Sequence, residues 1–139
     1  MNYIKVLVFL ILIPVFFITC SEDTPLEPSP PATKLSTFAE IQKQVFDATG
    51  CTNSGCHSGN NPAASLNLSP GNSFNQLVEV TSLLVPAQKR VDRNNSLESV
   101  LVRILRVDVT PRMPLGGTPL SSATIDSIAK WIDEGAQNN

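Results

Sequence analysis

The chain has 139 residues, of which 42% are hydrophobic and 16% are charged, and its formal net charge is −2. This length predicts a single domain with at most a short appendage. The near-neutral charge excludes the strongly basic surface that neutralises phosphates, so nucleic acid is not an expected partner.

A hydrophobic leader opens the chain. Residues 1–19 carry one positive charge, at Lys5, and the apolar run from Val6 to Ile18 is about 13 residues long, which is short for a membrane span but typical of a signal-peptide core. Cys20 follows at once. This arrangement resembles a bacterial lipoprotein signal, in which the cysteine becomes the lipidated first residue of the mature chain. An ordinary signal peptide and a short uncleaved anchor are the alternatives.

A proline-rich segment, residues 20–35, comes next. Its prolines stand among polar and charged residues, a composition that cannot build a core and favours an extended tether. The acidic pair Glu22-Asp23 resembles the surface-export tag of some bacterial lipoproteins. We therefore expect an exported protein that a lipid anchors to the cell envelope, at the outer membrane, the periplasmic face or the cell surface, in a compartment that permits disulfides.

The remaining residues, 36–139, predict one all-α domain with unusually long loops. A first helix starts at Thr37, because Thr37 and Glu40 have the spacing of a capping box, and it ends at Gly50. Its apolar face consists of Phe38, Ile41, Val45 and Ala48, with Phe46 beside it.

Two further amphipathic helices follow. One begins near Asn95, where Asn95 to Glu98 again predicts a capping box. Its apolar side consists of Leu97, Val100, Leu101, Ile104 and Leu105. The last helix has Ser121 as its cap, with Leu120 and Ile125 spaced as a hydrophobic staple. It is expected to bury Ile125, Ile128, Ala129 and Ile132, to carry Trp131 and to end at Gly135.

Long, poorly periodic stretches, 51–70 and 107–120, separate these helices. A short helix from Ser73 to Val80 and a brief extended piece at Leu83 to Val85 are the elements expected between them. Long structureless loops in a compact domain are either functional or evidence against the assignment of the elements. These loops need something around which to fold.

The loop after the first helix reads Cys51-Thr52-Asn53-Ser54-Gly55-Cys56-His57. Cys-x-x-Cys-His is the attachment signature of c-type haem; here four residues rather than two separate the cysteines. Two other interpretations stay open. A structural disulfide would leave His57 without a role, and a zinc site would need a further strong ligand, although no other Cys or His remains once Cys20 is lipidated.

Met113 stands in the loop before the last helix, between Arg112 and Pro114, and is the only methionine besides the initiator. A thioether from a proline-flanked loop is a suitable iron ligand, and nearby prolines would stiffen that loop. The alternative is a methionine that fills a gap in the core.

Taken together, these features resemble a class I c-type cytochrome, of the kind found on bacterial export lipoproteins. They include the closing run Trp131-Ile132-Asp133-Glu134-Gly135-Ala136. The resemblance implies a small helical fold with its first and last helices packed crosswise around one covalent haem c, which would complete a core that is poor in aromatic residues. It further implies attachment at Cys51 and Cys56, and His57 and Met113 as axial iron ligands.

With both axial positions filled, this interpretation predicts an electron carrier rather than an enzyme. A catalytic haem protein such as a peroxidase would need an open position on the iron. The expected partners are a redox protein or a membrane electron-transport component, and the membrane itself through the lipid anchor. The alternative function is a haem-free, disulfide-stapled lipoprotein that acts as a binding or structural module.

Cations concentrate in residues 89–112. Arg112 is the best-placed candidate to pair with a haem propionate, because it adjoins Met113. The others could form a docking face for an acidic redox partner or an ordinary solvated face. They are Lys89, Arg90, Arg93, Arg103 and Arg106.

Overall fold

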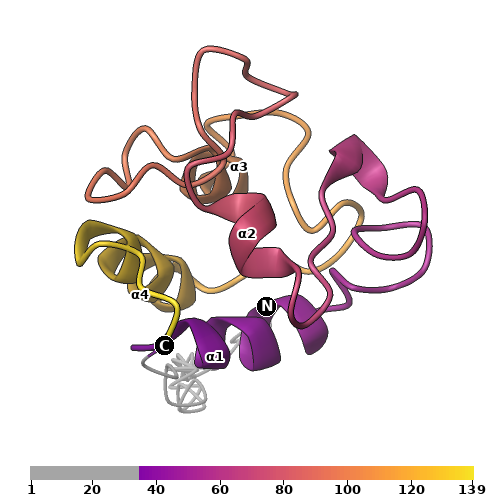
Figure 1. Ribbon diagram of the computed structural model, residues 1–139, viewed down its shortest axis with the longest axis horizontal. Helices are drawn as coiled ribbons and strands as arrows, with labels where there is room; N and C mark the ends of the chain where they lie inside the picture. The colour runs from indigo at the N-terminus through magenta and orange to yellow at the C-terminus, as the bar shows by residue number, and fades with distance from the viewer. Residues whose placement is uncertain (1–34) are drawn as a thin grey trace, which may run out of the picture.

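The computed structural model describes residues 35–139, which are helical and contain no β-strand (Figure 1). The predicted signal peptide, the lipidation site Cys20 and all of the tether except Leu35 lie outside this range. The elements in chain order are α1 (Phe38–Ile41), η1 (Gln42–Asp47), η2 (Ala63–Ser65), α2 (Ser73–Leu77), α3 (Val100–Arg106) and α4 (Ser122–Asp133). The prediction of an all-α class with long loops is confirmed at this coarse level. No helix within residues 35–139 is both long and apolar enough to span a membrane.

The first helix begins as predicted. The Thr37 hydroxyl accepts from the Glu40 N–H at 3.2 Å, and the Glu40 carboxylate accepts from the N–H groups of Ser36 and Thr37 at 2.7 and 3.1 Å. The α1 helix continues directly into η1, which has π-helical hydrogen bonding. Gly50, with φ +77°, ends the following turn. A Cβ there would lie 2.7 Å from the Asn53 side-chain nitrogen, so both conformation and space favour glycine.

The second predicted helix starts later than expected. It begins at Val100, because the N–H groups of Val100 and Leu101, which a helix from Asn95 would use in its first turn, donate instead to the Lys89 and Arg90 carbonyls at 3.1 and 2.9 Å. Half of the expected capping box forms, since the Asn95 side-chain oxygen accepts from the Glu98 N–H at 3.4 Å, whereas the Glu98 carboxylate accepts from the Gln88 side chain rather than from the Asn95 N–H. Leu97 lies outside the helix and is 71% exposed, so its assignment to the buried face was wrong.

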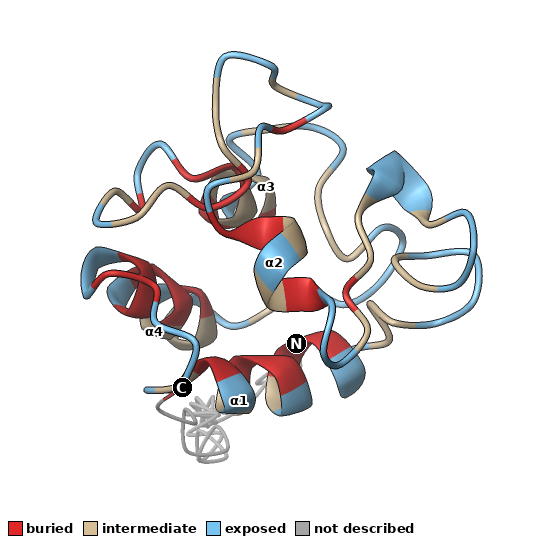
Figure 2. Cartoon of the chain, viewed as in Figure 1, coloured by how far each residue is buried: buried red, intermediate tan, exposed pale blue. Residues whose placement is uncertain are grey.

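The last helix agrees closely with expectation. The Ser121 hydroxyl accepts from the Thr124 N–H at 3.1 Å, and α4 then runs to Asp133, two residues before Gly135 at φ +99°. Figure 2 shows its buried stripe facing the rest of the domain. That stripe consists of Ile125, Ile128, Ala129, Trp131 and Ile132.

Between these helices the chain departs from two smaller expectations. The α2 helix is shorter than the predicted Ser73 to Val80, since it ends at Leu77. The predicted extended piece at Leu83 to Val85 is absent from the described chain, where β-pairing is limited to two isolated bridges, Val78 with Val91 and Thr81 with Lys89.

Phe38 joins the first and last helices at the centre of the core. Its ring centroid lies 5.4 Å from that of Trp131, 5.2 Å from that of Phe74 and 6.4 Å from that of Phe46. The start of α1 also meets the end of the chain, where the Ala39 N–H donates to the Asn139 carbonyl at 2.9 Å. Most of the loop 51–70 lies beyond the end of η1 (Figure 1), and its last residues return to the core, where Leu68 is buried and Pro70 lines a pocket with Phe38 and Phe74.

Candidate functional site: a dithiol and histidine loop

The four-residue spacer between the two cysteines folds as consecutive tight turns. The Asn53 N–H donates to the Gly50 carbonyl at 3.0 Å, and the Cys56 N–H donates to the Asn53 carbonyl at 3.0 Å. The His57 N–H then returns to the Cys51 carbonyl at 2.9 Å. The longer spacer thus forms an exposed bulge, and the backbones of Cys51 and His57 meet at its base.

The two thiols have different surroundings, and neither is in a disulfide within residues 35–139. Cys51 is half-buried against the hydrophobic core, and its Sγ lies 3.3 Å from the Thr49 hydroxyl. Burial raises the pKa of the Cys51 thiol, because a thiolate is poorly solvated there. Cys56 is exposed.

The His57 side chain is held through one ring nitrogen. Nδ1 lies 3.1 Å from the carbonyl oxygen of Ala63. Because a carbonyl can only accept, Nδ1 carries the hydrogen, and the lone pair of the neutral ring is on Nε2. The backbone around the ring is also fixed: the Leu68 N–H donates to the His57 carbonyl at 2.7 Å, and the Ala63 N–H donates to that of Cys56 at 2.8 Å. The loop therefore presents one nitrogen suited to metal ligation.

Met113 comes from a different part of the chain but packs on the same core. Its N–H donates to the Ile104 carbonyl of α3 at 3.2 Å, and its side chain, like that of Cys51, is partly buried against the core cluster. The neighbouring Arg112 donates through Nη2 to the Gly117 carbonyl at 2.9 Å. Its Nη1 is buried without a hydrogen-bond partner in residues 35–139, and such an atom calls for an explanation.

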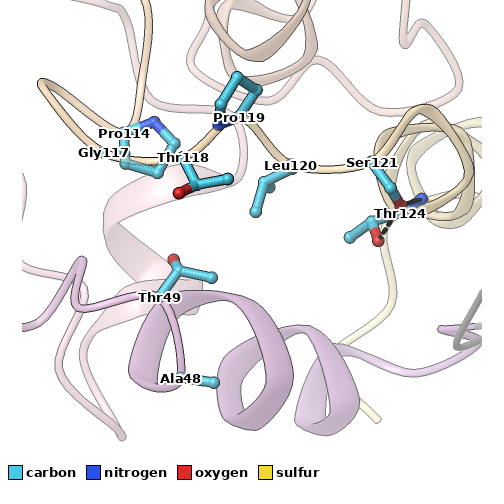
Figure 3. A pocket seen from close by; sticks show the side chains of 9 residues that line it. All are labelled: Ala48, Thr49, Pro114, Gly117, Thr118, Pro119, Leu120, Ser121 and Thr124. Carbon is cyan, nitrogen blue, oxygen red and sulfur yellow. Dashed lines mark hydrogen bonds between the residues drawn. The ribbon is translucent and has the colours of Figure 1, made fainter. Parts of the chain in front are cut away.

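A cleft of about 440 Å³ separates the end of the first helix from the loop that follows Met113. Figure 3 shows Ala48 and Thr49 on the helix side and Thr118 and Leu120 opposite them. The volume is within the range of small-molecule sites. The lining includes residues adjacent to the candidate ligands rather than Cys51, His57 or Met113 themselves.

The cations of residues 89–112 are engaged within the chain. Lys89 pairs with Glu79 and Asp92 at 2.5 and 2.8 Å, and Arg106 pairs with Asp126 at 2.7 Å. Hydrogen bonding to both carboxylates raises the pKa of Lys89. The remaining arginines donate to neutral acceptors: Arg90, Arg93 and Arg112 to backbone carbonyls, and Arg103 to the Gln88 side chain. The ion pairs of Lys89 and Arg106 offset part of the charge that the stretch offers to an acidic partner, whereas the contacts with neutral acceptors leave the charge of the other arginines in place.

The sequence analysis did not identify two groups that surround this site, the Ala63 carbonyl and the Arg90 side chain. The Ala63 carbonyl that accepts from His57 is a backbone group, and no sequence signal marks a backbone oxygen as a functional contact. Arg90 was expected at the surface, but it is 7% exposed. In the sequence, Arg90 stands in a run of cations and cannot be distinguished from a surface residue.

In comparisons with known proteins, no family model, curated protein or solved structure matches this chain. Within residues 35–139, no group of three or more His, Cys, Asp or Glu side chains is placed to hold a metal ion by itself. The zinc interpretation therefore gains no ligand set from this part of the chain.

Proposed function

We propose that the protein is a membrane-tethered monohaem cytochrome c that transfers electrons. The observation that carries the proposal is the hydrogen bond between His57 Nδ1 and the Ala63 carbonyl, in a loop that also holds two free thiols. Metal-ligating histidines almost always donate their second ring nitrogen to a carbonyl or carboxylate. In this chain that arrangement exists within the Cys-x4-Cys-His run.

The thiols suit covalent attachment. Each thiol of Cys51 and Cys56 could add across a vinyl group of a porphyrin, its hydrogen passing to the vinyl carbon. The half-buried Cys51 sulfur would form the bond against the core, and the exposed Cys56 sulfur would form it at the rim. A disulfide between them is the alternative, and the free thiols do not favour it.

Met113 and Arg112 supply the remaining groups that such a cofactor needs. Met113 is fixed to α3 through its N–H and partly buried against the core that Cys51 also contacts. Together with His57, a thioether ligand from Met113 would favour the reduced metal relative to a second histidine. The buried Arg112 Nη1 is a donor suited to a propionate.

A haem bound by these residues would supply a one-electron Fe(II)/Fe(III) couple. The protein's part would be to hold the group with Cys51 and Cys56, to ligate its iron with His57 and Met113, and to exclude water with the apolar core. Because His57 and Met113 would leave no ligand site for a substrate, we propose outer-sphere electron transfer with a redox protein or a membrane electron-transport component. Lipidation at Cys20 would place the domain at the cell envelope.

The decisive experiment is a pyridine haemochrome spectrum of the chain produced beside a haem-maturation system, after denaturation and solvent extraction. We expect haem to stay with the polypeptide, and a Cys51→Ser/Cys56→Ser double variant to lose it. Cys20→Ser, which removes the third thiol, is the matched control and should retain haem. Haem that is extracted from the unaltered chain would contradict covalent attachment, and complete absence of haem would favour the stapled module.

The sixth ligand is tested separately with Met113→Ala in the loaded protein. We expect its absorbance spectrum to change, because an axial position is freed. Leu115→Ala removes a side chain from the same loop that is 73% exposed, and it should leave the spectrum unchanged. Identical spectra for Met113→Ala and the unaltered protein would remove Met113 from the ligand set.

A further inference from the structure

Arg90 is a buried cation whose guanidinium is used entirely on backbone oxygens. Its Nη1 donates to the Gln76 carbonyl at 2.8 Å, and its Nη2 donates to the carbonyls of Ala64 and Ser65 at 2.9 and 3.3 Å. The side chain is 7% exposed, and an arginine keeps its charge even when desolvated. Burying a cation is costly unless its hydrogen bonds are made, so the contact is expected to hold the backbone tightly.

The segment that Arg90 holds has an unfavourable backbone. Ala64 and Ser65 have φ of +52° and +50°, and neither is glycine. Side chains with a Cβ rarely adopt the left-handed region, and such residues persist where the surroundings enforce them. Here one guanidinium nitrogen, Arg90 Nη2, binds the carbonyls of both residues.

The same turn carries the oxygen that orients His57. Ala63 directly precedes the two left-handed residues, and its carbonyl lies 3.1 Å from His57 Nδ1. We propose that Arg90 is a positioning residue for His57: by fixing the Ala63–Ser65 turn to the Gln76 carbonyl of α2, it sets the ring tautomer and orientation of the iron ligand. The inference rests on the proposed haem function, because it treats His57 as that ligand.

The physical consequence follows from hydrogen bonding at a ligating imidazole. A carbonyl that accepts from Nδ1 selects the tautomer with its lone pair on Nε2 and makes the ring a stronger electron donor. If the turn relaxes, that carbonyl moves and the ring loses its preference. Arg90 would thus act on His57 through the Ala63 backbone, without touching the ring.

The test uses the full chain produced without haem, and it measures the His57 tautomer from its ring ¹⁵N shifts at about pH 8, above the usual range of imidazole protonation. We expect the Nδ1–H form to predominate. Arg90→Lys keeps the charge but loses the planar fork, and it should lower the ratio of Nδ1–H to Nε2–H forms about fivefold, as expected for one hydrogen bond. Arg93→Lys is the matched control, since Arg93 also donates to two backbone carbonyls, those of Gly135 and Ala136. An unchanged ratio in folded Arg90→Lys, or an equal change in both variants, would overturn the proposal.

A second variant approaches the turn from the other side. Ala64→Pro cannot adopt a positive φ, and residue 64 is exposed, so the core stays intact while Arg90 remains. We expect the same loss of the Nδ1–H form. Should Arg90→Lys fail to fold, Ala64→Pro decides: a shifted ratio supports the turn as the orienting element, and an unshifted one overturns it.

A measurement on the haem-loaded protein separates this inference from the proposed function. Haem retention in the pyridine haemochrome assay tests the function, whereas the tautomer ratio tests the role of Arg90 in the haem-free chain. In the loaded protein, Arg90→Lys should shift the midpoint potential upward relative to Arg93→Lys, because a weaker imidazole donor stabilises the oxidised metal less. Equal potentials in the two variants would overturn the role of Arg90 while leaving the haem proposal intact.

Discussion

The carboxylate of Asp133, on the last residue of α4, accepts two hydrogen bonds from Ser96, one from its backbone N–H at 2.8 Å and one from its hydroxyl at 2.9 Å. Ser96 is buried, so its two donors depend on this single side chain. The contact fixes the segment before α3 to the end of α4.

Asp133→Ala should therefore destabilise the fold by about 1–3 kcal/mol, because it leaves a buried N–H and hydroxyl without an acceptor. Urea unfolding would measure the change. Asp126→Ala, on an exposed position of the same helix, removes only the surface ion pair with Arg106 and should cost about 1 kcal/mol or less. Equal losses of unfolding free energy in the two variants would show that the hydrogen bonds to Ser96 contribute no more than the surface ion pair.

Phe38→Ala should cost about 3–5 kcal/mol, the usual range for removing a buried aromatic side chain. The Phe38 ring contacts three other aromatic rings and joins the first helix to α4. Leu97→Ala is a suitable control, since Leu97 is 71% exposed, and its effect should stay within about 0.5 kcal/mol. A large loss of stability for Leu97→Ala would mean that Leu97 is buried, as its sequence pattern predicts.

Glu40 should make part of the stability depend on pH. Hydrogen bonds from the N–H and hydroxyl of Ser36, and from the N–H of Thr37, hold the pKa of the Glu40 carboxyl below its ordinary value of 4.5. Its stabilisation is thus fully present above pH 4.5 and is lost as the pH falls through the lowered folded-state pKa. Thermal unfolding of Glu40→Gln and the unaltered chain at about pH 7 and about pH 3 should show a smaller pH effect in the variant. Parallel profiles would contradict this account of the cap.

The two candidate haem-attachment thiols should react at different rates in the folded, haem-free chain. Burial raises the pKa of Cys51, and only the thiolate is strongly nucleophilic, whereas Cys56 is exposed. Iodoacetamide near neutral pH should alkylate Cys56 first, and peptide mass spectrometry would show it. In urea the two rates should converge, because the difference arises from the fold. Equal rates in the folded chain would mean that Cys51 is not buried as described.

The helices with self-contained signals were predicted well. Thr37 with Glu40, and Ser121 with Thr124, begin their helices through contacts of three residues' separation, and Gly50 and Gly135 follow the ends in the left-handed conformation that glycine adopts most readily. Such contacts depend on local chemistry, so they can be read from the chain itself. The apolar face of α4 was likewise evident from its spacing.

The residues of the candidate site were also named from the sequence: Cys51, Cys56 and His57 by their spacing, and Met113 and Arg112 by their neighbours. Their functional roles remain predictions. Only the tertiary structure decided what surrounds them, such as the Ala63 carbonyl against His57, the half-burial of Cys51 and the isolation of Arg112 Nη1.

Long-range competition decided the rest. The pattern from Asn95 to Glu98 is a plausible helix start, yet the carbonyls of Lys89 and Arg90 accept from the N–H groups that its first turn would use. Arginine is usually a surface residue, but Arg90 is buried and donates to the carbonyls of Gln76, Ala64 and Ser65. The sequence by itself determined the helical class and the chemistry available in the loops. Which backbone oxygens and carboxylates those side chains meet depends on segments that come together only when the chain folds.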